Sequence, residues 1–213
     1  MIVILLGPPG AGKGTQAKRL SERTGWFHFS TGDRMRQERA AGTDLGRQFD
    51  LYMAQGMLVP DDLVMRLVKK QIEESASAKG IVFDGFPRTI AQAHALDSLL
   101  GAFGKSVDHV IVFDVSEEVV VERITGRRVC EACGKVYHVV FEPPPLSGKC
   151  LACGSSQIVQ RNDDSEETVR KRYRLYLQGS EAIIQHYSRV LLKVDASQVA
   201  DVVTRNLFEM LKL

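Results

Sequence analysis

The chain has 213 residues, of which 44% are hydrophobic and 25% charged, so one globular core with insertions is the expected architecture. A formal net charge of +2 argues against a polybasic surface for nucleic acid or membrane, and no apolar run approaches the ~20 residues that cross a bilayer. The apolar start, Met1–Leu6, lacks a charged flank and runs into glycines, which argues against a signal peptide. We therefore expect a cytoplasmic protein.

Strand-like and helix-like segments alternate along most of the chain, which predicts βαβ units and a parallel sheet covered by helices. The predicted strands are Ile2–Leu6, Trp26–Ser30, Ile81–Asp84, Val110–Val115 and Val190–Asp195. Apolar residues at helical spacing predict helices over Lys13–Glu22, Asp61–Ser75, Ala91–Leu99 and Glu117–Ile124. The order of the strands in the sheet is not visible in the sequence.

Two segments interrupt this alternation and are predicted to be insertions into the α/β core. Residues 31–60 carry two short helical patterns and no strand. Residues 127–162 contain all the cysteines, a run of prolines and short β-prone stretches without helical periodicity. Asp164, with Glu167 three residues later, fits an N-cap and capping box, so a helix is expected to begin there.

The stretch GPPGAGKGT, Gly7–Thr15, predicts a phosphate-binding loop, because it follows a strand and precedes a helix. Its glycines let backbone N–H groups face phosphate oxygens, while Lys13 can reach the transferred phosphate and Thr15 can hold Mg²⁺ or its waters. Gly14 stands where the usual pattern has Ser or Thr, which indicates a subclass. The alternative interpretation is a plain glycine-rich turn.

A second polar element follows the strand Ile81–Asp84. Asp84 ends this strand, where a carboxylate can organise water around Mg²⁺, although a strand-terminal Asp is more often a simple turn residue. Arg88 lies just beyond, on the side where open α/β sheets bind ligands.

Arginines cluster around the second insertion and just after it. Phosphoryl transfer between nucleotides needs such side chains, because guanidinium groups stay charged and bind phosphate oxygens in pairs. Arg127 and Arg161 flank the cysteine segment, and Arg172 follows on the next predicted helix. For any single arginine, the alternative is a solvated helix face.

The four cysteines form two CxxC pairs, which predicts a metal site. Four thiolates fill a tetrahedral zinc site and leave no position for substrate, so the expected role of Cys130, Cys133, Cys150 and Cys153 is structural. Two disulfides or four free thiols are the alternatives. We expect His138 to be a residue of a strand and not a ligand, and no other histidine stands out.

Taken in order, these motifs resemble the adenylate kinases, particularly the bacterial form with a long lid that carries four metal ligands. The resemblance covers nearly the whole chain and depends on GPPGAGKGTQA, STGD, GMLVPDDLV, DGFPRTIAQA, GRRV, VYHVVF and DDSEETVRKR. It implies a P-loop nucleotide-kinase core with a parallel five-stranded sheet (residues 1–29, 60–126 and 165–213). The two insertions would be a helical AMP-binding segment (30–59) and a small β-rich zinc-binding lid (127–164).

The resemblance implies the reaction ATP + AMP ⇌ 2 ADP, with Mg²⁺, structural Zn²⁺, direct in-line transfer and a monomeric enzyme. The implied catalytic residues are Lys13, Arg88, Arg127, Arg161 and Arg172. ATP contacts would come from Gly10, Ala11, Gly12, Lys13, Gly14, Thr15, Arg123, Arg127 and Tyr137, with Thr15 and Asp84 organising Mg²⁺. AMP contacts would come from Thr31, Arg36, Met57, Leu58, Val59, Gly85, Arg88, Gln92, Arg161 and Arg172, and Asp163 and Asp164 would tie down the closed lid. Without the resemblance, Gln92 reads as an exposed helix residue.

Two other functions stay open at this point. A close variant would use GTP as donor or another monophosphate as acceptor. A zinc-ribbon protein that binds nucleic acid and uses nucleotide as a switch would need a basic, aromatic surface, and the small net charge speaks against it.

Overall fold

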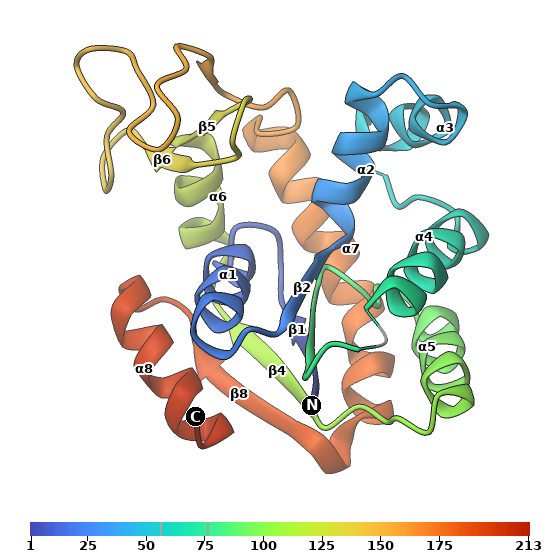
Figure 1. Ribbon diagram of the computed structural model, residues 1–213. Helices are drawn as coiled ribbons and strands as arrows, with labels where there is room; N and C mark the ends of the chain where they lie inside the picture. Colours follow the sequence, from blue (N-terminus) through green and yellow to red (C-terminus); the bar gives the residue numbers. More distant parts are fainter. Residues whose placement is uncertain (56, 76) are drawn as a thin grey trace.

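A five-stranded parallel sheet forms the centre of the computed structural model, which describes residues 1–55, 57–75 and 77–213 (Figure 1). Gly56, inside the predicted AMP-binding segment, and Ala76 lie outside the described residues. The strands are β1 (Ile2–Leu6), β2 (Phe27–Ser30), β3 (Ile81–Asp84), β4 (His109–Asp114) and β8 (Leu191–Asp195), in the order β2-β3-β1-β4-β8. The predicted α/β fold with its five parallel strands is confirmed.

Strand β1 runs through the middle of the sheet, and its five residues are all buried. Alternate side chains enter two separate cores, because successive residues of a strand point to opposite faces. Ile2, Ile4 and Leu6 join one core, whereas Val3 and Leu5 join the other. A strand covered on both faces needs a continuous apolar run, which is the pattern that the sequence shows.

Helices cover both faces of the sheet. One face packs against α4 (Asp61–Glu74) and α5 (Ile90–Ala102), and the other against α1 (Lys13–Thr24), α6 (Glu117–Thr125) and α8 (Ala200–Leu211). The long helix α7 (Glu166–His186) reaches both cores, with Val169 in the second and Ile183 in the first. Helix α8 and the short 3₁₀ helix η1 (Ser188–Val190) were not predicted. None of the helices in the described ranges combines the length and the apolar run that crossing a membrane requires.

The predicted start of α7 is wrong by one residue. The N-cap is Ser165, whose hydroxyl accepts from the Thr168 N–H, and Asp164 precedes it. Asp164 cannot serve as the cap because its buried carboxylate binds Arg127 instead.

The first insertion contains the two expected short helices, α2 (Thr31–Ala40) and α3 (Asp44–Met53), and no strand among its described residues. Ser30 and Thr43 cap them through side-chain oxygens that accept from Asp33 and Gly46. Gly46 allows α3 to approach α2, because a Cβ there would lie 2.2 Å from the Glu38 carbonyl oxygen.

The second insertion forms a small antiparallel sheet of β5 (Arg127–Cys130), β6 (Val136–His138) and β7 (Ile158–Val159), in the order β6-β5-β7. It stands above the central sheet, across from α2 and α3 (Figure 1). Its core consists of Cys130, Tyr137 and Cys150, with Ile158 packed against them. A core this small gives little stability without a cross-link.

Candidate active site

The loop between β1 and α1 has the shape of a phosphate cradle. Gly10 and Gly12 have φ values of 76° and 91°, a region that favours glycine, and Gly12 caps α1 without a side chain. Lys13 Nζ donates to the carbonyl oxygens of Gly7 at 2.7 Å and Pro8 at 2.8 Å. Its third N–H therefore stays available to a phosphate oxygen beside the N-terminus of α1.

Several charged groups converge on Lys13. Burial lowers the pKa of Lys13 to about 8, the Asp84 carboxylate opposes this shift, and the charges of Arg88, Arg172 and Arg127 add to it. These arginines come from three distant parts of the chain, so the structure gathers them around the phosphate loop.

This pKa predicts how ATP use depends on pH. Since Lys13 is charged below about pH 8, kcat/KM for ATP should be level there and should fall as the pH rises further, because a neutral amine holds phosphate poorly. The folded pKa lies below the usual 10.5, so the charged lysine destabilises the fold below pH 8, and this cost disappears between about pH 8 and 10.5. Kinetics from about pH 6.5 to 9.5 check this, and a level profile across that range would contradict it.

The arginines crowd one another. The surrounding protein and the charge of Arg172 lower the pKa of Arg88 to about 10, although solvent reaches this side chain. Burial and the charges of Arg36 and Arg127 lower the pKa of Arg161 to about 10. Cations this close repel one another, which is the environment that a polyphosphate neutralises.

Aspartates pair with these arginines. The Asp164 carboxylate, with no exposed area, accepts from Arg127 Nε at 2.9 Å and from its Nη2. Arg172 Nη1 donates to Asp163 Oδ2 at 2.8 Å. Burial alone would raise the pKa of Asp163, but the charges of Arg172 and Arg127 outweigh it and lower that pKa. Asp163 and Asp164 therefore each bind an arginine at the end of the second insertion.

A third aspartate reaches across from the first insertion. Asp33 on α2 pairs with Arg36, and its Oδ1 lies 3.9 Å from Arg161 Nη2. The two insertions are thus linked by one carboxylate between two guanidinium groups.

The surroundings of Asp84 fit a hydrated Mg²⁺. Its Oδ2 lies 3.3 Å from the place of a Cβ on Gly14, so any side chain there would crowd the carboxylate. This close approach is consistent with glycine in the place of the usual Ser or Thr. The adjacent Thr15 hydroxyl is exposed and has no hydrogen-bond partner within the described chain.

His28 on β2 was not among the predicted site residues. Its Nε2 is buried without a hydrogen bond and lies 3.7 Å from Asp84 Oδ2. An unsatisfied buried nitrogen needs a partner, and a water held beside Asp84 can supply it. The available signal was a polar residue at the centre of the strand Phe27–Ser30.

On the predicted AMP side, the structure connects four of the residues by hydrogen bonds. Thr31 Oγ1 donates to the Gly85 carbonyl oxygen at 2.9 Å, Arg88 Nε donates to the same oxygen at 2.7 Å, and the Arg88 backbone N–H donates to Gln92 Oε1 at 2.7 Å. Gln92 is only 2% exposed, so its interpretation as an exposed helix residue is wrong. The segment 57–59 belongs to no helix or strand, and the Val59 side chain enters the core.

On the predicted ATP side, Arg123 Nη1 donates to the Ala196 carbonyl oxygen at 2.7 Å, and Nη2 donates to that of Ser197 at 3.0 Å. The guanidinium plane is thereby fixed against the turn after β8. Tyr137 is different, because its side chain is 1% exposed and its hydroxyl lies against Cys150. The Tyr137 side chain therefore lies inside the core of the small sheet and is not exposed toward the phosphate loop.

Comparison with known proteins agrees with this geometry. The family model for adenylate kinase matches residues 5–191. The chain belongs to the adenylate kinase family. Adenylate kinases are ATP:AMP phosphotransferases, so the predicted class of enzyme is confirmed at the level of the family.

Relatives at high identity carry the same name. An adenylate kinase of Archaeoglobus fulgidus is 50% identical over 200 residues, which cover 93% of this chain and 92% of the relative. Those of Kosmotoga olearia and Thermosipho melanesiensis are 47% and 44% identical over 214 residues; the match covers the whole of this chain in both cases, and 99% and 100% of the relatives.

The four cysteines lie together, as their spacing predicts. Their sulfur atoms all lie within 4.8 Å of one another, and the pairs Cys130–Cys153 and Cys133–Cys150 are 3.6 Å apart. A disulfide needs about 2.05 Å, so the disulfide alternative is wrong. Tetrahedral Zn²⁺ with bonds of about 2.3 Å separates its sulfurs by roughly 3.8 Å, which fits these distances.

The cluster also has the polar support that metal ligands need. The Tyr137 hydroxyl donates to Cys150 Sγ at 3.3 Å and accepts from the Leu151 N–H at 2.9 Å. This hydrogen bond lowers the pKa of the Cys150 thiol to about 6, which favours the thiolate form.

His138 is a strand residue, as expected. It lies on β6 and stacks on Phe141 with ring centroids 4.4 Å apart. Its Nε2 lies 3.2 Å from the Glu122 carbonyl oxygen, and a Cβ on Gly126 would lie 2.2 Å from the same nitrogen. Glycine at 126 therefore allows the small sheet of the second insertion to contact the end of α6.

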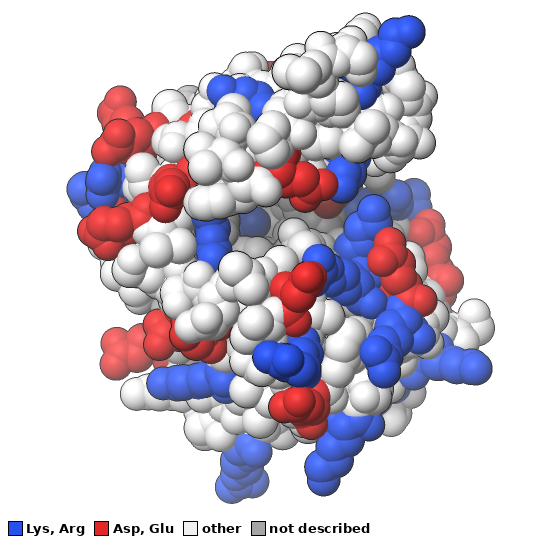
Figure 2. Space-filling model, turned by 90° about the vertical axis from the view of Figure 1, so that its left-hand side faces the viewer, with Lys and Arg blue, Asp and Glu red and all other residues white. Residues whose placement is uncertain are grey.

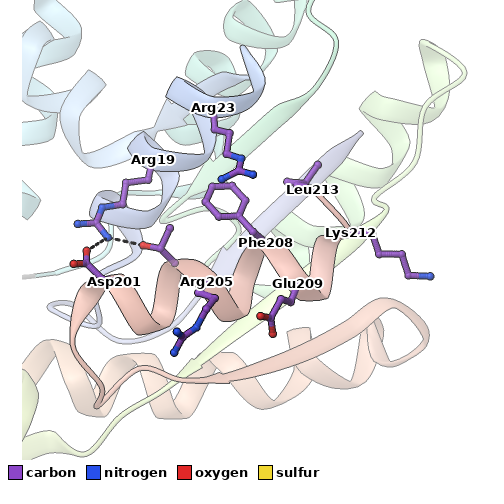
Figure 3. Close-up of a pocket in the computed structure, with 9 residues that line it drawn as sticks. Arg19, Arg23, Asp201, Arg205, Phe208, Glu209, Lys212 and Leu213 are labelled. Carbon is purple, nitrogen blue, oxygen red and sulfur yellow. Dashed lines mark hydrogen bonds and ion pairs between the residues drawn. The ribbon is translucent and has the colours of Figure 1, made fainter.

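A groove of about 430 Å³ lies between α1 and α8, and none of the residues that line it belongs to the phosphate loop (Figure 3). Lys and Arg side chains gather over the lower half of the face on which α8 lies (Figure 2). In the groove, Arg19 pairs with Asp201 at 2.8 Å, and Arg23 stacks on Phe208. Arg23 and Lys212 stand at the C-terminal ends of α1 and α8, where cations offset the helix dipoles. We assign this groove to packing and not to phosphate binding.

Proposed function

We propose that this chain catalyses the reversible, Mg²⁺-dependent transfer of the terminal phosphoryl group of ATP to AMP, giving two ADP. The observation that carries the proposal is the convergence of Lys13, Arg88, Arg127 and Arg172 on one another from four separate segments, as the shifted pKa of Lys13 reflects. No other cluster of cations among the described residues lies beside a phosphate-binding loop.

The residues would act by positioning and by electrostatic stabilisation. Phosphoryl transfer spreads negative charge over the moving group, and cations fixed around it stabilise that charge without needing to reorganise. Lys13 would keep its contacts with the Gly7 and Pro8 carbonyls and donate its third N–H to a phosphate oxygen. Bound Mg²⁺ would neutralise phosphate charge, with Thr15 and Asp84 holding its waters. Direct in-line transfer needs no covalent intermediate.

The remaining sites follow from the arrangement of these groups. We assign Gly10–Thr15 and Arg123 to ATP, with the backbone at Tyr137. Thr31, Gly85 and Gln92 would hold AMP together with the backbone of Met57–Val59, and Arg36, Arg88, Arg161 and Arg172 would hold its phosphate. A chain of hydrogen bonds links Thr31, Gly85, Arg88 and Gln92, and this supports one continuous acceptor site.

We propose a core of residues 1–29, 60–126 and 165–213, an AMP-binding insertion at 30–59 and a lid at 127–164. The lid would move about hinges near 126 and 164 and carry Arg127 and Arg161 onto the phosphates while excluding water. The approach of Arg161 to Asp33 supports contact between lid and insertion. We assign Zn²⁺ to the four cysteines as a structural ion, since four thiolates leave no coordination position for substrate. The cytoplasmic location and the monomeric state stay predictions.

A coupled assay tests the proposal. ATP offered with AMP, CMP, UMP and GMP, and then GTP offered with AMP, should give clear turnover only for ATP with AMP. Preference for GTP as donor or for another acceptor would replace the proposal with the close variant. Absence of phosphoryl transfer, together with salt-sensitive binding of DNA or RNA, would favour the nucleic-acid alternative.

A further inference from the structure

An acidic side chain at the start of α4 holds the amide of Gln92 in one orientation. Gln92 Nε2 donates to Asp61 Oδ1 at 2.6 Å, and Gln92 Oε1 accepts from the Arg88 backbone N–H at 2.7 Å. Turned by half a rotation, the amide would set its oxygen against a carboxylate and its NH₂ against an N–H. Both contacts are repulsive, and they are costly because Gln92 is buried. The orientation of the amide is therefore fixed.

Asp61 is itself held in place. Its second oxygen, Oδ2, accepts from Thr89 Oγ1 at 2.8 Å, and Thr89 also caps α5 by accepting from the Gln92 N–H at 3.1 Å. Both carboxylate oxygens are thus engaged by α5 and its cap. The hydroxyl of Thr89 and the amide of Gln92 are donors, so they select an acceptor-only side chain at position 61.

We propose that Asp61 is a specificity-determining residue that makes the acceptor site favour adenine over bases whose 6-position carries a carbonyl. The inference rests on the proposed function, in which Gln92 faces the base of AMP. Each polar atom of the amide is used once, so Nε2 keeps one N–H and Oε1 keeps one lone pair. Adenine presents an acceptor at N1 and a donor at its 6-amino group, which match this pair in the fixed orientation.

Hypoxanthine and guanine reverse this pattern. They carry an N1–H and a 6-oxo group, so the fixed amide would meet a donor with its N–H and an acceptor with its oxygen. Binding them would require the amide to rotate, which Asp61 opposes. A site that leaves buried polar groups unpaired rejects the wrong base strongly. Asp61 acts through Gln92 and is a positioning residue.

The test compares AMP with inosine monophosphate, whose base differs from adenine in this edge alone. We would measure kcat/KM for each acceptor at saturating ATP in the wild type, Asp61→Asn and Asp62→Asn. The asparagine of Asp61→Asn can offer either an N–H or an oxygen to Gln92, so the amide of Gln92 is free to adopt both orientations. The ratio of kcat/KM for AMP to that for IMP should therefore fall at least about tenfold, through KM and not kcat. Asp62 is the matched control, because it is an exposed carboxylate in the same first turn of α4. Asp62→Asn should preserve the ratio.

Further variants separate the possible failures. Asp61→Ser, whose hydroxyl can donate or accept, replaces Asp61→Asn if that variant does not fold, as judged by thermal melting. If the ratio of kcat/KM for AMP to that for IMP is unchanged in the Asp61 variants, or if both values fall equally, the inference about Asp61 is wrong. If Gln92→Ala still raises KM for AMP in that case, the proposed AMP site stands without it. If Gln92→Ala leaves KM for AMP unchanged, the placement of the acceptor base fails and the inference fails with it.

Discussion

Replacing Lys13 with methionine should lower kcat by about a thousandfold or more, with the fold intact. The lysine is the cation nearest the phosphate loop carbonyls, and Arg88, Arg127 and Arg172 all influence its pKa. Removing one fixed donor to developing charge commonly costs about 10² to 10³ in rate, and Lys13 supplies a full charge as well. The measurement is kcat with saturating ATP and AMP, together with a thermal melt.

Lys18→Met is the matched control for this loss. Lys18 lies on the same helix, is exposed and pairs with Glu22 at 3.8 Å. Such surface pairs contribute little, so turnover should stay near the wild-type value. If Lys13→Met keeps turnover within about tenfold of wild type, the assignment of the phosphate loop is wrong.

Replacing Cys130 and Cys133 together with serine should abolish zinc binding and lower the melting temperature of the lid, while leaving substantial activity well below that temperature. The lid core consists of Cys130, Tyr137 and Cys150 with Ile158, which cannot replace the lost cross-link. For a chain of this length, each kcal/mol of lost stability lowers the midpoint by about 2–4 °C. Zinc content per chain, calorimetry and the kinase assay are the three measurements.

Activity should survive because the metal has no free coordination position and the reacting groups lie elsewhere. Val140→Ser, at an exposed position of the same lid, is the control and should keep both zinc and melting temperature. Complete loss of phosphoryl transfer in a folded, metal-free variant would mean that the ion takes part in the reaction.

The local elements of this fold could be read from the sequence because each depends on a short pattern. The five strands, the phosphate loop and the two CxxC pairs were all predicted, since period, glycine placement and cysteine spacing act within a few residues. The predicted start of helix α7 at Asp164 was wrong, because the helix end and a residue distant in sequence compete for the Asp164 carboxylate. Arg127, 37 residues away, takes the carboxylate that the pattern assigned to the helix.

For the candidate site too, the sequence predicted the identities of the residues but not the contacts between them. Lys13, Asp84 and the arginines were selected by residue type and by resemblance, yet the sequence gives no distances between them. His28 was missed because its significance depends on strand β2 lying beside β3, which brings its ring to Asp84. Without the resemblance, Gln92 was interpreted as an exposed helix residue, because the hydrogen bond of its amide to Asp61, 31 residues earlier, is not visible in the sequence.

By itself, the sequence determined which residues can hold phosphate and metal, because those capacities belong to side-chain chemistry and local spacing. Only the tertiary structure decided which of them act together. Strand order and helix packing set the contacts between distant segments: Asp164 with Arg127, Asp61 with Gln92, and the arginines with Lys13. These contacts depend on the whole core, and no short pattern encodes them.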